Sequence, residues 1–156
     1  MRRKAKTVIV LSCHVLVLLG LKVAHAAPAD NCTGFIAEVN RAYEQSLEVG
    51  NAGRVNSFTS YDIVTSDAPE INGELGECRG TWVASDGKYT GGGYCSFKDK
   101  DGDTQYLRWE ASFPVGTWRS VGGTGKWADN NNSGWIRLVT RDDKRTLLQW
   151  GGTCEK

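Results

Sequence analysis

The chain has 156 residues, among them 19 lysines and arginines, 18 aspartates and glutamates, five cysteines and two histidines. Its first 26 residues are typical of a cleaved secretory signal, because a basic start is followed by an apolar run and by Ala24-His25-Ala26, a small-x-small cleavage site. This segment holds five basic and no acidic residues, so 14 basic residues remain against 18 acidic ones. The resulting net charge of −4 argues against nucleic acid or an anionic membrane surface as a partner.

The signal segment also contains both histidines, His14 and His25. Their loss excludes Ser-His-Asp triads, histidine general bases and histidine-ligated metals from the exported protein. The apolar run of about 15 residues is shorter than the roughly 20 that a membrane-spanning helix needs. We therefore expect no cofactor, no metal and no membrane span, while the oligomeric state stays open.

The remaining residues, 27–156, are expected to form one domain, secreted or periplasmic, with four cysteines. An even number of cysteines in a small exported chain favours two disulfides. Asp86-Gly87 is a strong signal for a two-residue hairpin loop, and this loop places Cys78 directly opposite Cys95. The sequence therefore predicts the disulfides Cys78–Cys95 and Cys32–Cys154, the second of which ties the two ends of the domain together.

The first segment of the domain has two interpretations. Apolar residues every four positions from Phe35 to Leu47 suit a helix, whereas alternation from Tyr43 to Val49 suits a strand. We expect a short helix or irregular stretch near 33–40 and a strand over 42–49. A turn at 50–53 and a strand over 55–65 follow.

The next strands are predicted more firmly, from about residue 77 onward. In the hairpin around Asp86-Gly87, the face with Cys78 and Trp82 is the better core face. A three-residue loop at Lys100-Asp101-Gly102 then places Leu107 opposite Cys95 and Trp109 opposite Gly93, on that same core face.

Three further strands are expected over 117–121, 133–140 and 145–150, with the last turn at Asp142-Asp143-Lys144. The chain thus predicts an all-β, antiparallel fold of seven to eight strands connected in order. A barrel is favoured over a sandwich, because closure removes the exposed strand edges.

One segment carries a family resemblance. Residues Gly122-Gly123-Thr124-Gly125-Lys126-Trp127-Ala128, followed by Gly134-Trp135, resemble the G-G-T-G-x-aromatic segment of the allene oxide cyclase and dirigent barrels. The likeness covers 117–140 in detail and only strand order elsewhere. More broadly, 43–140 resembles small exported bacterial proteins of that barrel class whose role is unassigned.

This resemblance implies an eight-stranded barrel whose interior can hold a small apolar molecule. The cyclases and dirigent proteins carry their catalytic or guiding polar residues on other strands, where this chain shows no match. No catalytic residue is therefore carried over from the family.

Two groups of side chains are candidate site residues. Trp82, Tyr89 and Trp109 share the predicted core face and would form an aromatic ligand site. Tyr94, Arg108 and Glu110 share the opposite face and would form an acid/base and anion-binding group only if that face lined the lumen.

A third group, Asp99, Asp101 and Asp103, resembles part of a calcium loop, but Gly102 stands at the fourth position and not at the sixth. We interpret this segment as a solvated turn.

Three functions fit these features. The leading hypothesis is an exported, non-catalytic barrel that binds a small apolar or aromatic molecule. The alternatives are a cofactor-free isomerase, cyclase or lyase, by analogy with the barrel class alone, and a structural envelope protein with a filled core.

Overall fold

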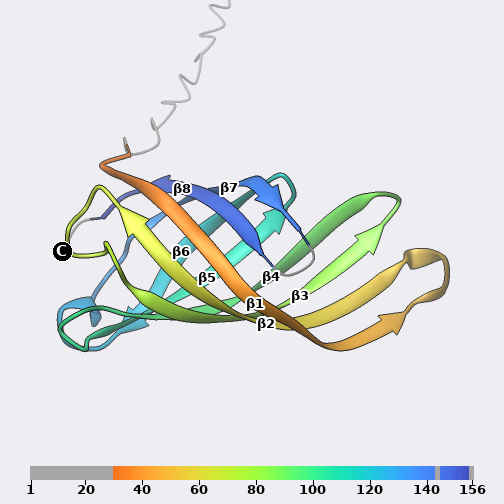
Figure 1. The fold of residues 1–156 in the computed structure, drawn as a ribbon, viewed down its shortest axis with the longest axis horizontal. Helices are drawn as coiled ribbons and strands as arrows, with labels where there is room; N and C mark the ends of the chain where they lie inside the picture. Colours follow the sequence, from red (N-terminus) through yellow and green to blue (C-terminus); the bar gives the residue numbers. More distant parts are fainter. Residues whose placement is uncertain (1–29, 143–144, 155–156) are drawn as a thin grey trace, which may run out of the picture.

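The eight strands of the chain form one closed antiparallel barrel in which each strand pairs with its sequence neighbours and β8 pairs with β1 (Figure 1). This computed structural model describes residues 30–142 and 145–154, so the expected signal segment and part of the last turn lie outside the described residues. The elements are β1 (Cys32–Glu48), η1 (Gly50–Ala52), β2 (Arg54–Ser66), β3 (Leu75–Ser85), β4 (Lys88–Lys98), β5 (Thr104–Ser112), β6 (Val115–Gly123), η2 (Gly125–Trp127), β7 (Ser133–Arg141) and β8 (Thr146–Gly152). No helix among the described residues is long and apolar enough to cross a bilayer.

The predicted fold class and both disulfides are confirmed. Cys78 lies opposite Cys95 in the β3–β4 hairpin, and their sulfurs are bonded. Cys32, at the start of β1, is bonded to Cys154, just beyond the end of β8. The second disulfide therefore joins the strand pair that closes the barrel.

The predicted register of β4 and β5 is also confirmed. Leu107 pairs with Cys95 and Trp109 with Gly93. The turn between the strands contains Gly102 at φ +92, as the three-residue loop requires, because that conformation favours glycine. The odd-numbered residues of β5 thus face the barrel interior.

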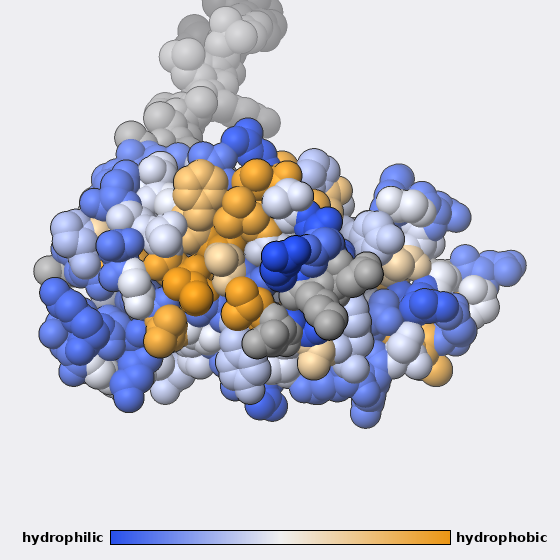
Figure 2. Space-filling model, viewed as in Figure 1, coloured by the Kyte–Doolittle hydropathy of each residue, from blue (hydrophilic) through white to orange (hydrophobic). Residues whose placement is uncertain are grey.

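The expected helix or irregular stretch near 33–40 is wrong, because β1 is a strand from Cys32 to Glu48. The apolar residues that suggested a helix, such as Phe35, point outward, and Phe35 is 44% exposed. The register shifts twice along β1, so the inward face does not follow a simple alternation. Figure 2 shows a gathering of apolar side chains on the outer surface over β8, β1 and β2.

The two ends of the barrel differ. At one end the loop between β2 and β3 packs inward, burying Ile71 and Glu74. At the other end the β1–β2 and β3–β4 hairpins extend beyond the remaining strands (Figure 1).

The glycine-rich segment that carried the family resemblance has a structural role. A Cβ built on Gly123 would lie 2.5 Å from the backbone oxygen of Thr104, so the close approach of the two strands requires glycine. Gly125 has a φ of +50 and begins η2, which carries Trp127 into a buried position. The segment therefore makes a tight corner between β6 and β7.

Candidate functional site

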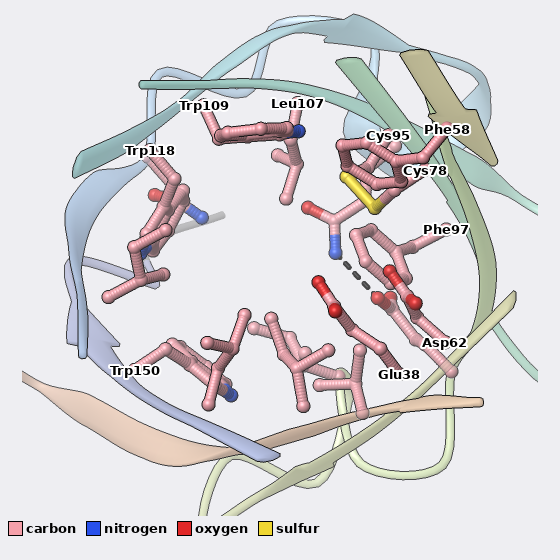
Figure 3. Close-up of a pocket in the computed structure, with 18 of the residues that line it drawn as sticks. Glu38, Phe58, Asp62, Cys78, Cys95, Phe97, Leu107, Trp109, Trp118 and Trp150 are labelled. Atoms are coloured by element: carbon pink, nitrogen blue, oxygen red, sulfur yellow. Dashed lines mark hydrogen bonds between the residues drawn. A yellow bond between two sulfur atoms is a disulfide. The ribbon is translucent and has the colours of Figure 1, made fainter. Parts of the chain in front are cut away.

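The barrel encloses a cavity of about 70 Å³ that is lined by side chains from all eight strands. By the rule that one water needs about 10–15 Å³, this space holds a few waters or a small group of a ligand. An aromatic ring the size of benzene would require side chains of the wall to move. One part of the wall is aromatic and another is acidic (Figure 3).

The aromatic part of the wall is a packed cluster. The Trp82 ring centroid lies 5.0 Å from that of Trp109 and 4.6 Å from that of Phe113. Trp118 and Trp150 meet edge to face at 6.0 Å. These contacts keep the rings in place around the lumen.

Trp109 depends on a glycine of a nearby strand. A Cβ built on Gly80 of β3 would lie 2.5 Å from the Trp109 ring. Glycine at this position leaves the space that the indole occupies.

The acidic part of the wall consists of Glu38 on β1, Asp62 on β2 and Glu74 at the end of the β2–β3 loop, all of them buried. In Figure 3, Glu38 and Asp62 extend from the wall into the lumen. Arg41 donates a hydrogen bond to Glu38, and the Gln105 side-chain amide donates one to Glu74 at 2.6 Å.

Asp62 differs from its two acidic neighbours. Neither of its carboxyl oxygens makes a hydrogen bond of normal geometry with a described residue, and Oε1 of Glu74 also has no such partner. The Asp62 carboxylate lies within 4.8 Å of the sulfurs of Cys78 and Cys95, but sulfurs joined in a disulfide are not thiolate ligands for a metal. Asp62 therefore presents to the cavity a buried carboxyl group whose interaction with the Ser60 hydroxyl falls short of a normal hydrogen bond.

Burial governs how these acids hold protons. It raises the pKa of Asp62 to about 7; the negative charge of Glu38 adds to this rise, while Ser60 and Arg41 oppose it. Burial also raises the pKa of Glu38, an effect that its ion pair with Arg41 reduces.

Glu74 behaves like Asp62. Burial raises its pKa to about 7; the hydrogen bond from Gln105 and the charge of Lys126 lower it, and the charge of Asp99 raises it. The lumen thus holds two carboxyl groups that exchange protons near neutral pH.

Two of the three aromatic residues singled out in the sequence lie in the lumen wall. Trp82 and Trp109 are both buried there and in contact. Tyr89 lies in the projecting part of the β3–β4 hairpin and is 44% exposed, with the guanidinium of Arg141 at 5.9 Å from its ring centroid.

The alternative polar group lies on the outer surface. Tyr94 pairs with Arg108 across β4 and β5, and Arg108 forms an ion pair with Glu110. Tyr94 is 59% exposed, and the side chains of Arg108 and Glu110 are 41% and 61% exposed. This face of the barrel does not line the lumen, so these residues do not form the interior acid/base group.

The three turn aspartates bind groups of the protein itself. Asp99 accepts hydrogen bonds from the Trp127 indole and from two backbone N–H groups of its own turn. Lys126 donates to Asp101 at 2.9 Å, and its backbone N–H donates to Asp103. Their carboxylates therefore hold the β4–β5 turn against η2, and they do not converge on one point as calcium ligands would.

The sequence did not reveal the acidic residues of the lumen, Glu38, Asp62 and Glu74. It also did not reveal their hydrogen-bond partners, Arg41 and Gln105. A usable signal for Asp62 was its spacing of two from Ser60 and Val64, which face the same side of β2. Outward-facing apolar neighbours concealed that signal.

Comparison with known proteins identifies the fold. No family model matches the chain, and no curated protein matches its sequence. The solved structure of the pterocarpan synthase dirigent protein PsPTS1 superposes with a TM-score of 0.53 at 13% identity, covering 81% of this chain and 95% of that one. A second pterocarpan synthase dirigent protein, GePTS1, gives a TM-score of 0.49 at 14% identity, over 95% of this chain and 96% of that one. The chain has the eight-stranded barrel fold of the dirigent and allene oxide cyclase-like class.

Proposed function

We propose that this protein binds a small, mostly apolar molecule inside the barrel, and that the molecule carries one polar group that contacts Asp62. The observation that supports this most directly is the Asp62 carboxyl, which is buried, faces the cavity and lacks a hydrogen bond of normal geometry. Buried polar groups in proteins are nearly always hydrogen-bonded, so an unpaired group that faces an internal space indicates a bound molecule or ordered water. The surrounding rings of Trp82 and Trp109 would supply most of the affinity.

We further propose that the protein is exported, to the periplasm or beyond the cell. The signal-like first 26 residues and the two disulfides support this location, since disulfides persist in oxidising compartments.

A second candidate function is acid–base catalysis without a cofactor, by an isomerase, cyclase or lyase. The observation that favours it is the pKa of about 7 at both Asp62 and Glu74, which suits proton transfer at neutral pH. In this role a protonated Asp62 would donate its proton to a bound substrate. Binding comes first in either case, and the hollow lumen does not favour a purely structural protein with a filled core.

Titration with benzene, toluene and indole tests the proposed function, using tryptophan fluorescence and calorimetry. We expect saturable binding of at least one probe, with side chains of the wall moving to admit the ring, because four tryptophans border the lumen and supply apolar contact surface. Leu107→Trp, which places a larger side chain into the cavity, should abolish that binding while the barrel remains folded. Tyr94→Ala, on the outer surface, should leave it unchanged. If no probe binds, or if Leu107→Trp binds as well as the parent protein, the proposed function is wrong.

A further inference from the structure

We infer that the lumen is built for a small organic cation, an ammonium group on an apolar body. This inference rests on the proposed function and specifies its ligand class. The geometry that carries it is the placement of three unpaired carboxyl oxygens, two on Asp62 and one on Glu74, and several indole rings around one cavity (Figure 3).

The charges of the lumen are unbalanced. Three carboxyl groups, Glu38, Asp62 and Glu74, line the cavity, whereas Arg41 is the guanidinium that contacts one of them, Glu38. Lys126 acts on Glu74 through its charge, but its ammonium group lies against Asp99 and Asp101, at 2.8 and 2.9 Å. Asp62 and Glu74 thus have no direct counter-ion among the described residues, and an ammonium group would supply one.

The aromatic wall suits the same ligand. Tryptophan rings offer a large apolar surface against which the carbon body of such a ligand can pack. Trp109, Trp118 and Trp150 border the cavity that Asp62 also lines. An amine can therefore place its charge at Asp62 and its carbon body against these rings.

Binding of such a cation would release protons. Near neutral pH the free lumen holds protons on Asp62 and Glu74, whose pKa values are raised to about 7 by burial. An ammonium group favours the ionised carboxylate, so a protonated Asp62 loses its proton to solvent as the amine binds. The charges of Glu38 and Arg41 also influence the pKa of Asp62. Gln105, Asp99 and Lys126 likewise influence the pKa of Glu74. Affinity should rise with pH through 7.

Isobutylamine, isobutanol and isobutyrate form a matched set of probes that differ mainly in charge. We expect isobutylamine to bind the disulfide-bonded protein at least tenfold more tightly than isobutanol at pH 8.5, and isobutyrate to bind weakest. The affinity for the amine should fall about tenfold between pH 8.5 and pH 6, since about nine-tenths of a carboxyl group with a pKa near 7 is protonated at pH 6. Calorimetry in two buffers of different ionisation enthalpy should detect the released proton at pH 6.

Asp62→Asn should remove the preference for the amine over isobutanol, because the asparagine amide carries no charge. Glu74→Gln should reduce the preference in part, and Glu110→Gln, which removes an acid from the outer surface, should not alter it. If isobutanol or isobutyrate binds as tightly as the amine, the ligand is not a cation, although the proposed function still stands. If none of these probes and none of the apolar probes binds, both proposals are overturned.

Discussion

The lumen and the corner where the β4–β5 turn packs against η2 each bury an aspartate. The two aspartates differ in their hydrogen-bond donors. Asp62 in the lumen is 3% exposed and Asp99 in the corner is 6% exposed. Asp99 accepts hydrogen bonds from the Trp127 indole at 2.9 Å and from two backbone N–H groups, and it contacts Lys126 at 2.8 Å. Asp62 has no hydrogen bond of this quality with any described residue.

The protonation of the two residues follows from these partners. Burial alone would raise the pKa of Asp99, but donors from Lys126, Trp127 and the turn backbone outweigh it and hold the pKa at about 2. Burial without such donors raises the pKa of Asp62 to about 7. Burial therefore does not by itself distinguish a structural aspartate from one available to a ligand, whereas the supply of hydrogen-bond donors does.

If only the centre of the barrel is hollow, the lumen wall should be packed as firmly as the corner. Trp109→Ala tests this, because it removes a ring in contact with Trp82 and Phe58. We expect urea unfolding to show a loss of about 3–5 kcal/mol, as for other large core side chains. Glu110→Gln, on the outer surface, should change the free energy of unfolding by less than about 0.5 kcal/mol. A minor loss for Trp109→Ala would mean that the wall is loose.

Loss of Asp99 from the corner should cause the next largest decrease in the free energy of unfolding. Asp99→Ala leaves Lys126, the Trp127 indole and two backbone N–H groups without their acceptor, and we expect it to lower the free energy of unfolding by about 3 kcal/mol at pH 7. Asp101→Ala, which removes an exposed partner of the same lysine, should cost less than about 1 kcal/mol. Equal losses in urea unfolding would contradict the central role of Asp99.

The Asp99 variant should also change the response to acid. Because the folded pKa of about 2 lies below the ordinary 3.8, the stabilisation by Asp99 is present above about pH 4 and is lost as the pH falls toward 2. The acid limb of the stability curve should therefore be flatter in Asp99→Ala.

Asp62→Asn should change the free energy of unfolding in the direction opposite to Asp99→Ala. Since the folded pKa of Asp62 is raised, the native protein binds the extra proton between about pH 4 and pH 7 and loses stability as the pH rises through that window. At pH 8 the substitution removes a buried charge, and we expect a gain of about 2 kcal/mol, whereas at pH 5 the change should be small. A loss of stability at pH 8 in urea unfolding would show that Asp62 has a partner after all.

Gln105→Leu tests the influence of a single donor on the other lumen carboxyl, Glu74. The variant removes the hydrogen bond that lowers the pKa of Glu74, so this pKa should rise further above its ordinary value. Carboxyl carbon chemical shifts followed by NMR during a pH titration would measure it. An unchanged titration of Glu74 would mean that the amide contact has no influence on the acid.

The part of the fold that could be predicted is the part with diagnostic turns. Asp86-Gly87 and Lys100-Asp101-Gly102 fix the loop lengths on both sides of β4, and loop length determines register. The inward positions of Trp82 and Trp109 and the Cys78–Cys95 pair followed from that register alone.

The acidic lumen could not be predicted because β1 and β2 reverse the usual pattern of burial. Asp62 points inward between two neighbours that point outward, Tyr61 and Ile63, and these are 54% and 42% exposed. A rule that places apolar side chains in the core therefore assigns the wrong face to this strand. Glu74 lies in a loop, where no periodicity indicates its direction.

The disulfide between Cys32 and Cys154 has a consequence for the connectivity of the chain. The Cα atoms of these residues lie 5.9 Å apart, and beside them the first part of β1, from Cys32 to Glu38, pairs with β8, so the two ends of the domain meet. A short peptide joining these ends would turn the polypeptide into a ring, and a new opening at Asn51, in the exposed tip between β1 and β2, would interrupt no ladder of the barrel wall. The fold should thus tolerate circular permutation, with the same closed wall assembled from a chain that begins at β2 and ends at β1.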